Sequence, residues 1–195
     1  MDKQKLIYNI IKILEENNFS RKNIHIQKFI SFLSYRIDNI PFSFSIDKYG
    51  PFSSELRDEL YSMVLWGDLF YIDNQYNTKN NLLSINQPIY QKIETEIKQY
   101  ANIIDELSFD NMLIYGTLFY ILNNTCSRDK DSIIQLFYNT VDTTFTNEQL
   151  EEPLDKLLKT YFDGIVGYRD RKTGYYVLPA DWDDGEDYTE YLKEK

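Results

Sequence analysis

Hydrophobic residues recur every three or four positions in residues 1–40, which is the spacing of one face of an α-helix. The first stripe, which Asn17 and Asn18 end, consists of Leu6, Ile7, Ile10, Ile11 and Leu14. A second helix is predicted over residues 21–36. Its core-facing residues are Ile26, Phe29, Ile30, Leu33 and Ile37. Pro41 breaks this pattern, so the chain is expected to begin with two helices.

Segment 47–72 organises the first half of the chain. It opens with a turn, Tyr49-Gly50-Pro51-Phe52, after which Ser53 or Ser54 can cap the amides of a new helix. Leu56, Leu60, Met63 and Val64 give this third helix one apolar face. Gly67 can end it in a left-handed cap.

A small hairpin is predicted directly after this helix. Residues 69–72 form a β-rich run, residues 73–81 are polar and read as a turn, and residues 82–85 read as the returning strand. Turn, helix, glycine stop and hairpin together predict the second half of a winged helix-turn-helix, in which the hairpin is the wing.

The second half of the chain predicts further helices. Pro88 suits the first turn of a long helix, a helix over residues 110–122 follows, and Ser127 is expected to open another. Gly116 is predicted to allow close packing of the helix that contains it.

A last helix and a second hairpin complete the pattern. Thr146 and Gln149 have the spacing of a capping box. Pro153 lies too deep for a first turn, so the helix is expected either to kink or to begin near Glu152. Residues 165–178 read as two strands joined by a polar turn.

These elements define a mainly helical fold of the α+β class with small β-hairpins, resembling a winged helix-turn-helix. Because three helices and a hairpin occur twice, the sequence predicts two tandem winged-helix units joined by a long helix. The units are residues 1–87 and 110–180, the connecting helix is 88–109, and an acidic aromatic tail is 181–195. We expect one compact body.

Composition places the chain among globular proteins. It is 43% hydrophobic and 16% aromatic, with 17 tyrosines. No apolar run approaches the roughly 20 residues that span a bilayer, and the N-terminus has no signal-peptide cleavage site. The one cysteine, Cys126, cannot form an internal disulfide, so we predict a cytoplasmic protein with no membrane association.

Charge is unevenly distributed. The net charge is −10, yet residues 1–50 contain 8 basic and 5 acidic side chains, so the rest of the chain carries −13. Such a field repels the phosphates that dominate nucleic-acid affinity. Acidic excess is also an ordinary means of solubility, and composition alone does not separate these interpretations.

Two motifs resemble the Panacea domains (SocA-like antitoxins) and the YwgA-like proteins. They are Ile26-Gln27-Lys28-Phe29 in the second helix and the turn from Tyr49 to Ser53, followed by a helix that ends in a glycine before an apolar pair, Leu69-Phe70. Segments 111–124 and 145–159 look more like the YwgA type. The resemblance covers about residues 5–160.

The resemblance implies a bacterial or phage protein without known catalysis. Panacea members neutralise toxins by binding them, and some act as adaptors to a protease. A shared fold does not fix this function.

Candidate catalytic and metal chemistry is sparse. His25 is the only histidine, lies between Ile24 and Ile26, and has no further ligand at metal-binding spacing, so we interpret it as a surface or packed residue. A catalytic Cys126 would need this distant histidine as its base. The acidic segment 181–187 does not have the order of residues that an EF-hand calcium-binding loop requires. We therefore predict no enzyme, no cofactor and no metal.

DNA binding is the alternative function, because winged helices read the major groove. The predicted recognition helix, however, offers Glu55, Arg57, Asp58 and Glu59. The expected basic surface would comprise Lys3, Lys5, Lys12, Arg21, Lys22, Lys28 and Arg36, with Arg169, Arg171 and Lys172 at the second hairpin tip. Nucleic acid is thus the less favoured partner.

The leading hypothesis is a non-enzymatic protein-interaction module, antitoxin-like or adaptor-like, whose partner is a toxin or the client of a protease. The predicted partner-binding residues are Tyr49, Phe52, Arg57, Trp66 and Trp182. For Phe52 and Trp66, each taken singly, core packing is the stronger interpretation. No oligomeric state is assigned.

Overall fold

The structure is a computed structural model that describes residues 1–79, 85–125, 129–142, 144–162, 168–169 and 176–177. This part of the chain is mainly helical and of the α+β class, with seven helices and three two-stranded antiparallel sheets. The helices are α1 Lys3–Glu16, α2 Asn23–Arg36, α3 Ser54–Trp66, α4 Gln87–Ile103, α5 Phe109–Asn124, α6 Lys130–Thr140 and α7 Asn147–Tyr161. The strands are β1 Ser45–Asp47, β2 Gly50–Phe52, β3 Leu69–Ile72, β4 Gln75–Thr78, β5 Tyr168–Arg169 and β6 Tyr176–Val177.

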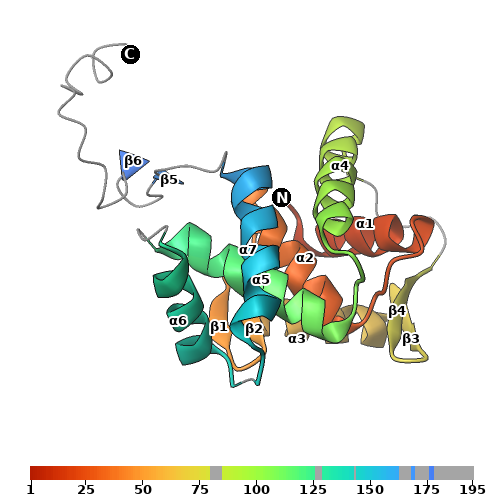
Figure 1. The fold of residues 1–195 in the computed structure, drawn as a ribbon. Coiled ribbons are helices and arrows are strands. Elements are labelled where there is room, and N and C mark those ends of the chain that lie inside the picture. Colours follow the sequence, from red (N-terminus) through yellow and green to blue (C-terminus); the bar gives the residue numbers. More distant parts are fainter. Residues whose placement is uncertain (80–84, 126–128, 143, 163–167, 170–175, 178–195) are drawn as a thin grey trace, which may run out of the picture.

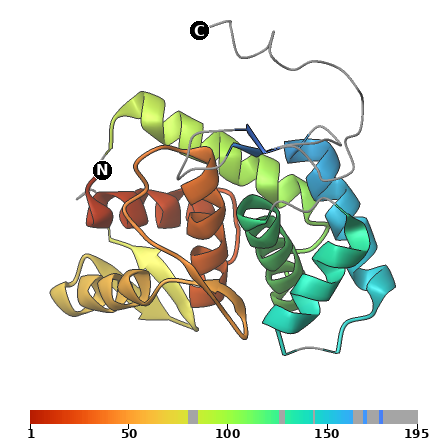
Figure 2. The ribbon, with the colours of Figure 1, turned by 90° about the vertical axis from the view of Figure 1, so that its left-hand side faces the viewer.

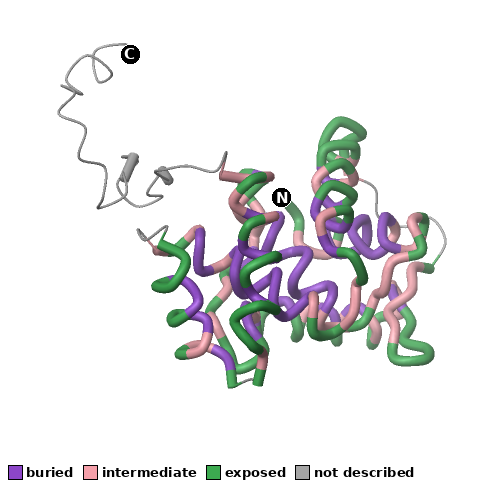
Figure 3. The backbone as a smooth tube through the Cα atoms, in the orientation of Figure 1, coloured by how far each residue is buried: buried purple, intermediate pink, exposed green. Residues whose placement is uncertain are grey.

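Helices α2 and α5 pack against each other at the centre of the molecule (Figures 1 and 2). On one side α4 packs on α2 and α1, and on the other α6 and α7 pack on α5. Both central helices are buried over most of their surface (Figure 3), as expected of helices that other elements surround. The first and second halves of the chain therefore share one hydrophobic core.

The helix ends confirm the local signals in the sequence. Ser53 caps α3 by accepting a hydrogen bond from the amide of Leu56, and Gly67 ends this helix at φ 80°. Thr146 and Gln149 form the predicted capping box of α7. This helix begins at Asn147 and runs through Pro153, so the alternative start near Glu152 is wrong.

The wing is shorter than predicted. Strand β4 lies within the polar run that was expected to be a turn, and it pairs with β3 from Ile72↔Gln75 to Leu69↔Thr78. Asp73 and Asn74 have φ of 51° and 61°, the left-handed conformation that a two-residue hairpin turn requires. The strand that returns along β3 is therefore Gln75–Thr78 and not the predicted segment 82–85, of which residues 82–84 lie outside the described residues.

Two further boundaries differ from the prediction. The turn at residues 49–52 belongs to a hairpin, because β1 and β2 pair from Asp47↔Gly50 to Ser45↔Phe52. Helix α6 begins at Lys130, where Asp129 accepts a hydrogen bond from the amide of Ser132; it does not begin at Ser127. The short side-chain acceptor of Asp129 thus decides where α6 begins.

The second hairpin occurs inside the predicted segment 165–178, where β5 pairs with β6. Three helices and a closing hairpin thus occur twice along the chain, as α1, α2, α3, β3, β4 and as α5, α6, α7, β5, β6, and the first series also contains the β1–β2 hairpin between α2 and α3. The division into tandem winged-helix units stays a prediction.

Candidate partner-binding surface

The turn that precedes α3 is held in place by two buried side chains of α2. Gln27 donates through Nε2 to the carbonyl of Ser53 at 3.0 Å and accepts from the Ser53 amide at 2.9 Å. Lys28 donates through Nζ to the carbonyls of Tyr49 and Pro51, the latter at 2.9 Å. The Gln-Lys motif and the Tyr-Gly-Pro turn, which carry the family resemblance, therefore contact each other directly.

Two glycines make room for this arrangement. Gly50 has φ 79°, and a Cβ there would overlap the buried Thr117 hydroxyl on α5. At Gly116 a Cβ would lie 2.9 Å from Cδ of Lys28. The close packing predicted at Gly116 is confirmed, and its partner is the aliphatic stem of Lys28.

Burial changes the ionisation of this lysine. Desolvation lowers the pKa of Lys28 to about 7, and the nearby Asp47 carboxylate only partly opposes this effect. Burying an ammonium group is energetically costly unless it is paired, and here the two turn carbonyls accept hydrogen bonds from it. The side chain thus serves the turn and does not contribute to a basic surface.

Three of the predicted partner-binding residues lie together around the turn. The Tyr49 ring is half exposed and meets Phe109 edge-on at 6.1 Å, and the Arg57 guanidinium lies 5.8 Å from the centre of the Phe52 ring. Tyr49 and Phe52 also line a pocket of about 150 Å³ above Lys28, enough space for a single side chain.

Trp66 lies apart from this group. It is nine residues beyond Arg57 on α3, about 13 Å along the helix axis at 1.5 Å per residue, and its side chain is 81% exposed. Core packing of Trp66 is therefore wrong, whereas Phe52 is partly buried. Trp182 lies outside the described residues.

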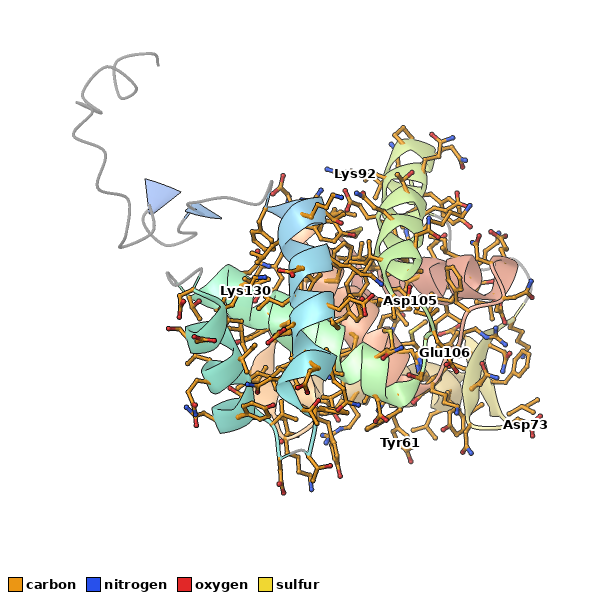
Figure 4. The ribbon with its side chains drawn as sticks, in the orientation of Figure 1. Tyr61, Asp73, Lys92, Asp105, Glu106 and Lys130 are labelled. Carbon is orange, nitrogen blue, oxygen red and sulfur yellow. The ribbon has the colours of Figure 1, made fainter. Side chains whose placement is uncertain are left out.

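Trp66 belongs to a larger exposed apolar surface. On α3, Tyr61 and Leu65 are 64% and 67% exposed and lie one turn apart, next to Trp66. Three residues of the following strand β3 are also exposed; Phe70 and Ile72 share one face of the hairpin, and Tyr71 lies on the other face with Tyr76. We call this the α3–β3 surface; it consists of Tyr61, Leu65, Trp66, Phe70, Tyr71 and Ile72. Figure 4 shows Tyr61 on α3 and Asp73 at the tip of the adjacent hairpin, both remote from Lys92 on α4 and Lys130 on α6.

The run of apolar residues before Gly67 is a sequence signal for this surface. Residues 63–66 are four consecutive apolar residues, Met-Val-Leu-Trp. Successive helical residues point about 100° apart, so four in a row cannot all face one core. Met63 is buried, and Leu65 and Trp66 point outward.

The histidine is packed, in agreement with one of its two interpretations. His25 is buried, its Nε2 is 2.8 Å from the carbonyl of Leu107, and its Nδ1 is 3.2 Å from Oγ of Ser20. Burial is the main cause that lowers its pKa. In the described part of the chain, no three His, Cys, Asp or Glu side chains come together in a way that could hold a metal ion.

Most members of the predicted N-terminal basic surface are engaged within the fold, while Lys5 and Lys22 are exposed. Lys28 is buried, and Arg21 donates to Phe19 and to two residues of β4. Other members are paired with carboxylates, as in Lys3–Glu55, Lys12–Glu16 and Arg36–Glu96. Arg171 and Lys172 lie outside the described residues. Most basic side chains of the N-terminal region thus form hydrogen bonds or ion pairs within the protein.

The fold and this surface define a mainly helical α+β protein with an exposed aromatic face. Among the described residues, no helix has the length and apolar character needed to cross a membrane. No family model matches the chain, and a search of curated proteins found no match either. The Panacea and YwgA-like resemblance therefore stays a hypothesis.

Proposed function

We propose that the chain is a non-enzymatic protein-interaction module, antitoxin-like or adaptor-like, that binds a protein partner through the α3–β3 surface. The observation that carries this proposal is that six large apolar side chains are exposed on two consecutive elements, within residues 61–72. Singly exposed hydrophobic residues are ordinary, whereas a concentration of them on one part of a surface is typical of interaction sites.

The size of the surface supports this function. An aromatic side chain offers roughly 150–250 Å², and four of the six residues are aromatic, with exposures from 41% to 81%. With Leu65 and Ile72 the surface presents on the order of 500 Å², against about 800 Å² per partner in a standard interface. The remaining area of a standard interface would come from polar residues around this apolar surface.

A winged-helix DNA-binding regulator is the second candidate, and the charges of α3 oppose it. In such a regulator, α3 would enter the major groove and offer basic or amide side chains to the bases. Its exposed polar positions instead include Glu55 and Asp58, and its one basic side chain, Arg57, pairs with Asp58 at 2.8 Å.

Site-specific photo-crosslinking tests the proposal. A photoreactive phenylalanine analogue replaces Tyr61 in one variant and Ile89, an exposed residue of α4, in the control. In cells that naturally contain the protein, we expect an adduct of one defined mass from position 61 and none of that mass from position 89.

Two outcomes would contradict the proposal. The absence of any specific adduct at position 61 would remove the α3–β3 surface as a binding site. An adduct that disappears on nuclease treatment would identify nucleic acid as the partner and would favour the regulator.

A further inference from the structure

The segment that contains the α3–β3 surface has an excess of negative charge. Residues 54–78 contain five carboxylates and one basic side chain, Arg57. The carboxylates are Glu55, Asp58, Glu59, Asp68 and Asp73. Lys3 pairs with Glu55, and Lys79 lies near Gly67 at the edge. Arg21 and Glu15, which both bond to β4, offset each other. With both lysines included, the region therefore keeps a net charge of −2, on a chain of net charge −10.

This charge argues against a second copy of the chain as the occupant. In a symmetric dimer built on this surface, the same patch lies on both subunits, so its negative excess would face the same negative excess on the other subunit. Like charges brought together across an interface disfavour association. The electrostatically complementary occupant is cationic.

The aromatic residues accept the same kind of partner. Tyr71 lies 4.8 Å from Tyr76 between ring centroids, so its ring is supported from one side by β4. The faces of Trp and Tyr attract lysine and arginine side chains within about 6 Å. Leu65 and Ile72 offer no such attraction and can only be covered by apolar side chains.

We propose that the α3–β3 surface binds a cationic amphipathic segment of the partner protein, in which lysine or arginine alternates with apolar side chains. Its apolar residues cover Leu65, Trp66 and Phe70, and its basic residues meet Asp68, Asp73 and the Tyr61 ring. This inference rests on the proposed function and specifies the chemistry of its partner.

Tryptophan fluorescence can test this inference. The chain has two tryptophans, so Trp182→Phe leaves Trp66 as the single reporter. The probes are two helical peptides of about 18 residues, or five turns, with leucines on one face and either lysines or glutamates on the other. We expect a blue shift of Trp66 emission with the Leu/Lys peptide, and at least tenfold weaker binding of the Leu/Glu peptide.

Salt and matched variants localise the effect. Leu/Lys binding should weaken as salt rises from about 50 to 200 mM, because the Debye length shortens. Measured by anisotropy of a labelled peptide, Leu65→Ala and Asp68→Asn should each weaken binding severalfold. The control Ile89→Ala, on α4, should leave it unchanged.

Three outcomes would overturn the inference. Equal binding of both peptides would show that charge is irrelevant, and unchanged binding by Leu65→Ala would place the peptide elsewhere. A blue shift on concentration without peptide, together with dimer sedimentation, would make a second copy the occupant. If crosslinking at position 61 captures a partner through an acidic segment, this inference fails while the proposed function stands.

Discussion

Replacing Lys28 by methionine should change how stability depends on pH. Burial lowers the pKa of this amine to about 7 in the folded protein, from an ordinary value of 10.5. Above pH 7 the unfolded chain still binds a proton that the folded protein has released. The free energy of unfolding therefore rises with pH between about 7 and 10.

The size of this effect follows from the pKa difference. One proton contributes roughly 1.4 kcal/mol per pH unit, so wild type should gain about 2–3 kcal/mol relative to Lys28→Met between about pH 6 and pH 9. Methionine fills the space beside Gly116 but has no titrating group. The variant also leaves the Tyr49 and Pro51 carbonyls without this donor, a cost that does not vary with pH.

Urea denaturation at several pH values measures the difference. The control is Lys5→Met, because Lys5 is exposed on α1 and its variant should follow the wild-type pH dependence. Unfolding free energies of wild type and Lys28→Met that run parallel from pH 6 to 9 would refute the reasoning. They would mean that Lys28 remains charged in the folded protein, held by the two carbonyls.

Two further predictions concern the packing at two glycines and the affinity for DNA. Gly50→Ala should lower the free energy of unfolding by about 2–5 kcal/mol, because φ is positive there and the new Cβ would overlap Thr117. Gly67→Ala should lower it by only about 1–2 kcal/mol, because no neighbouring atom is nearer than 3.8 Å to a Cβ at that position. Equal losses in thermal unfolding would contradict this packing. Duplex DNA should bind no tighter than the non-specific range, Kd of about 10⁻⁴–10⁻⁶ M at physiological salt. Submicromolar, sequence-specific binding in an anisotropy titration would reverse the ranking of the two functions.

The sequence predicted best what neighbouring residues decide. Ser53, Gly67 and the capping box of Thr146 act within one helical turn, so these residue types alone identify the helix ends. Strand β4 was missed because its residues, Gln75–Thr78, are polar and partly exposed. Its place is set by pairing with β3 and not by an apolar pattern of its own.

The role of Lys28 could not be predicted from its neighbours in the chain. A lysine in an amphipathic helix is normally exposed, and this one is buried because Gly116, far along the sequence, leaves space for its stem. The carbonyls that accept its hydrogen bonds belong to a third segment, the turn at Tyr49 and Pro51. Only the tertiary fold brings these three parts together.

Helix α3 has two sides that require different explanations. Its inner side, with Leu56, Leu60 and Met63, is buried, and Gln27 fixes its first turn by two hydrogen bonds to Ser53; this side accounts for the fold. The outer side, with Leu65 and Trp66, buries little within the chain and so contributes little to folding stability. Its apolar character would serve no purpose in an isolated domain, where charged residues at the same positions would improve solubility. A rigidly anchored helix with an uncovered aromatic side is what a preformed binding surface requires, since little order remains to be gained when the partner arrives.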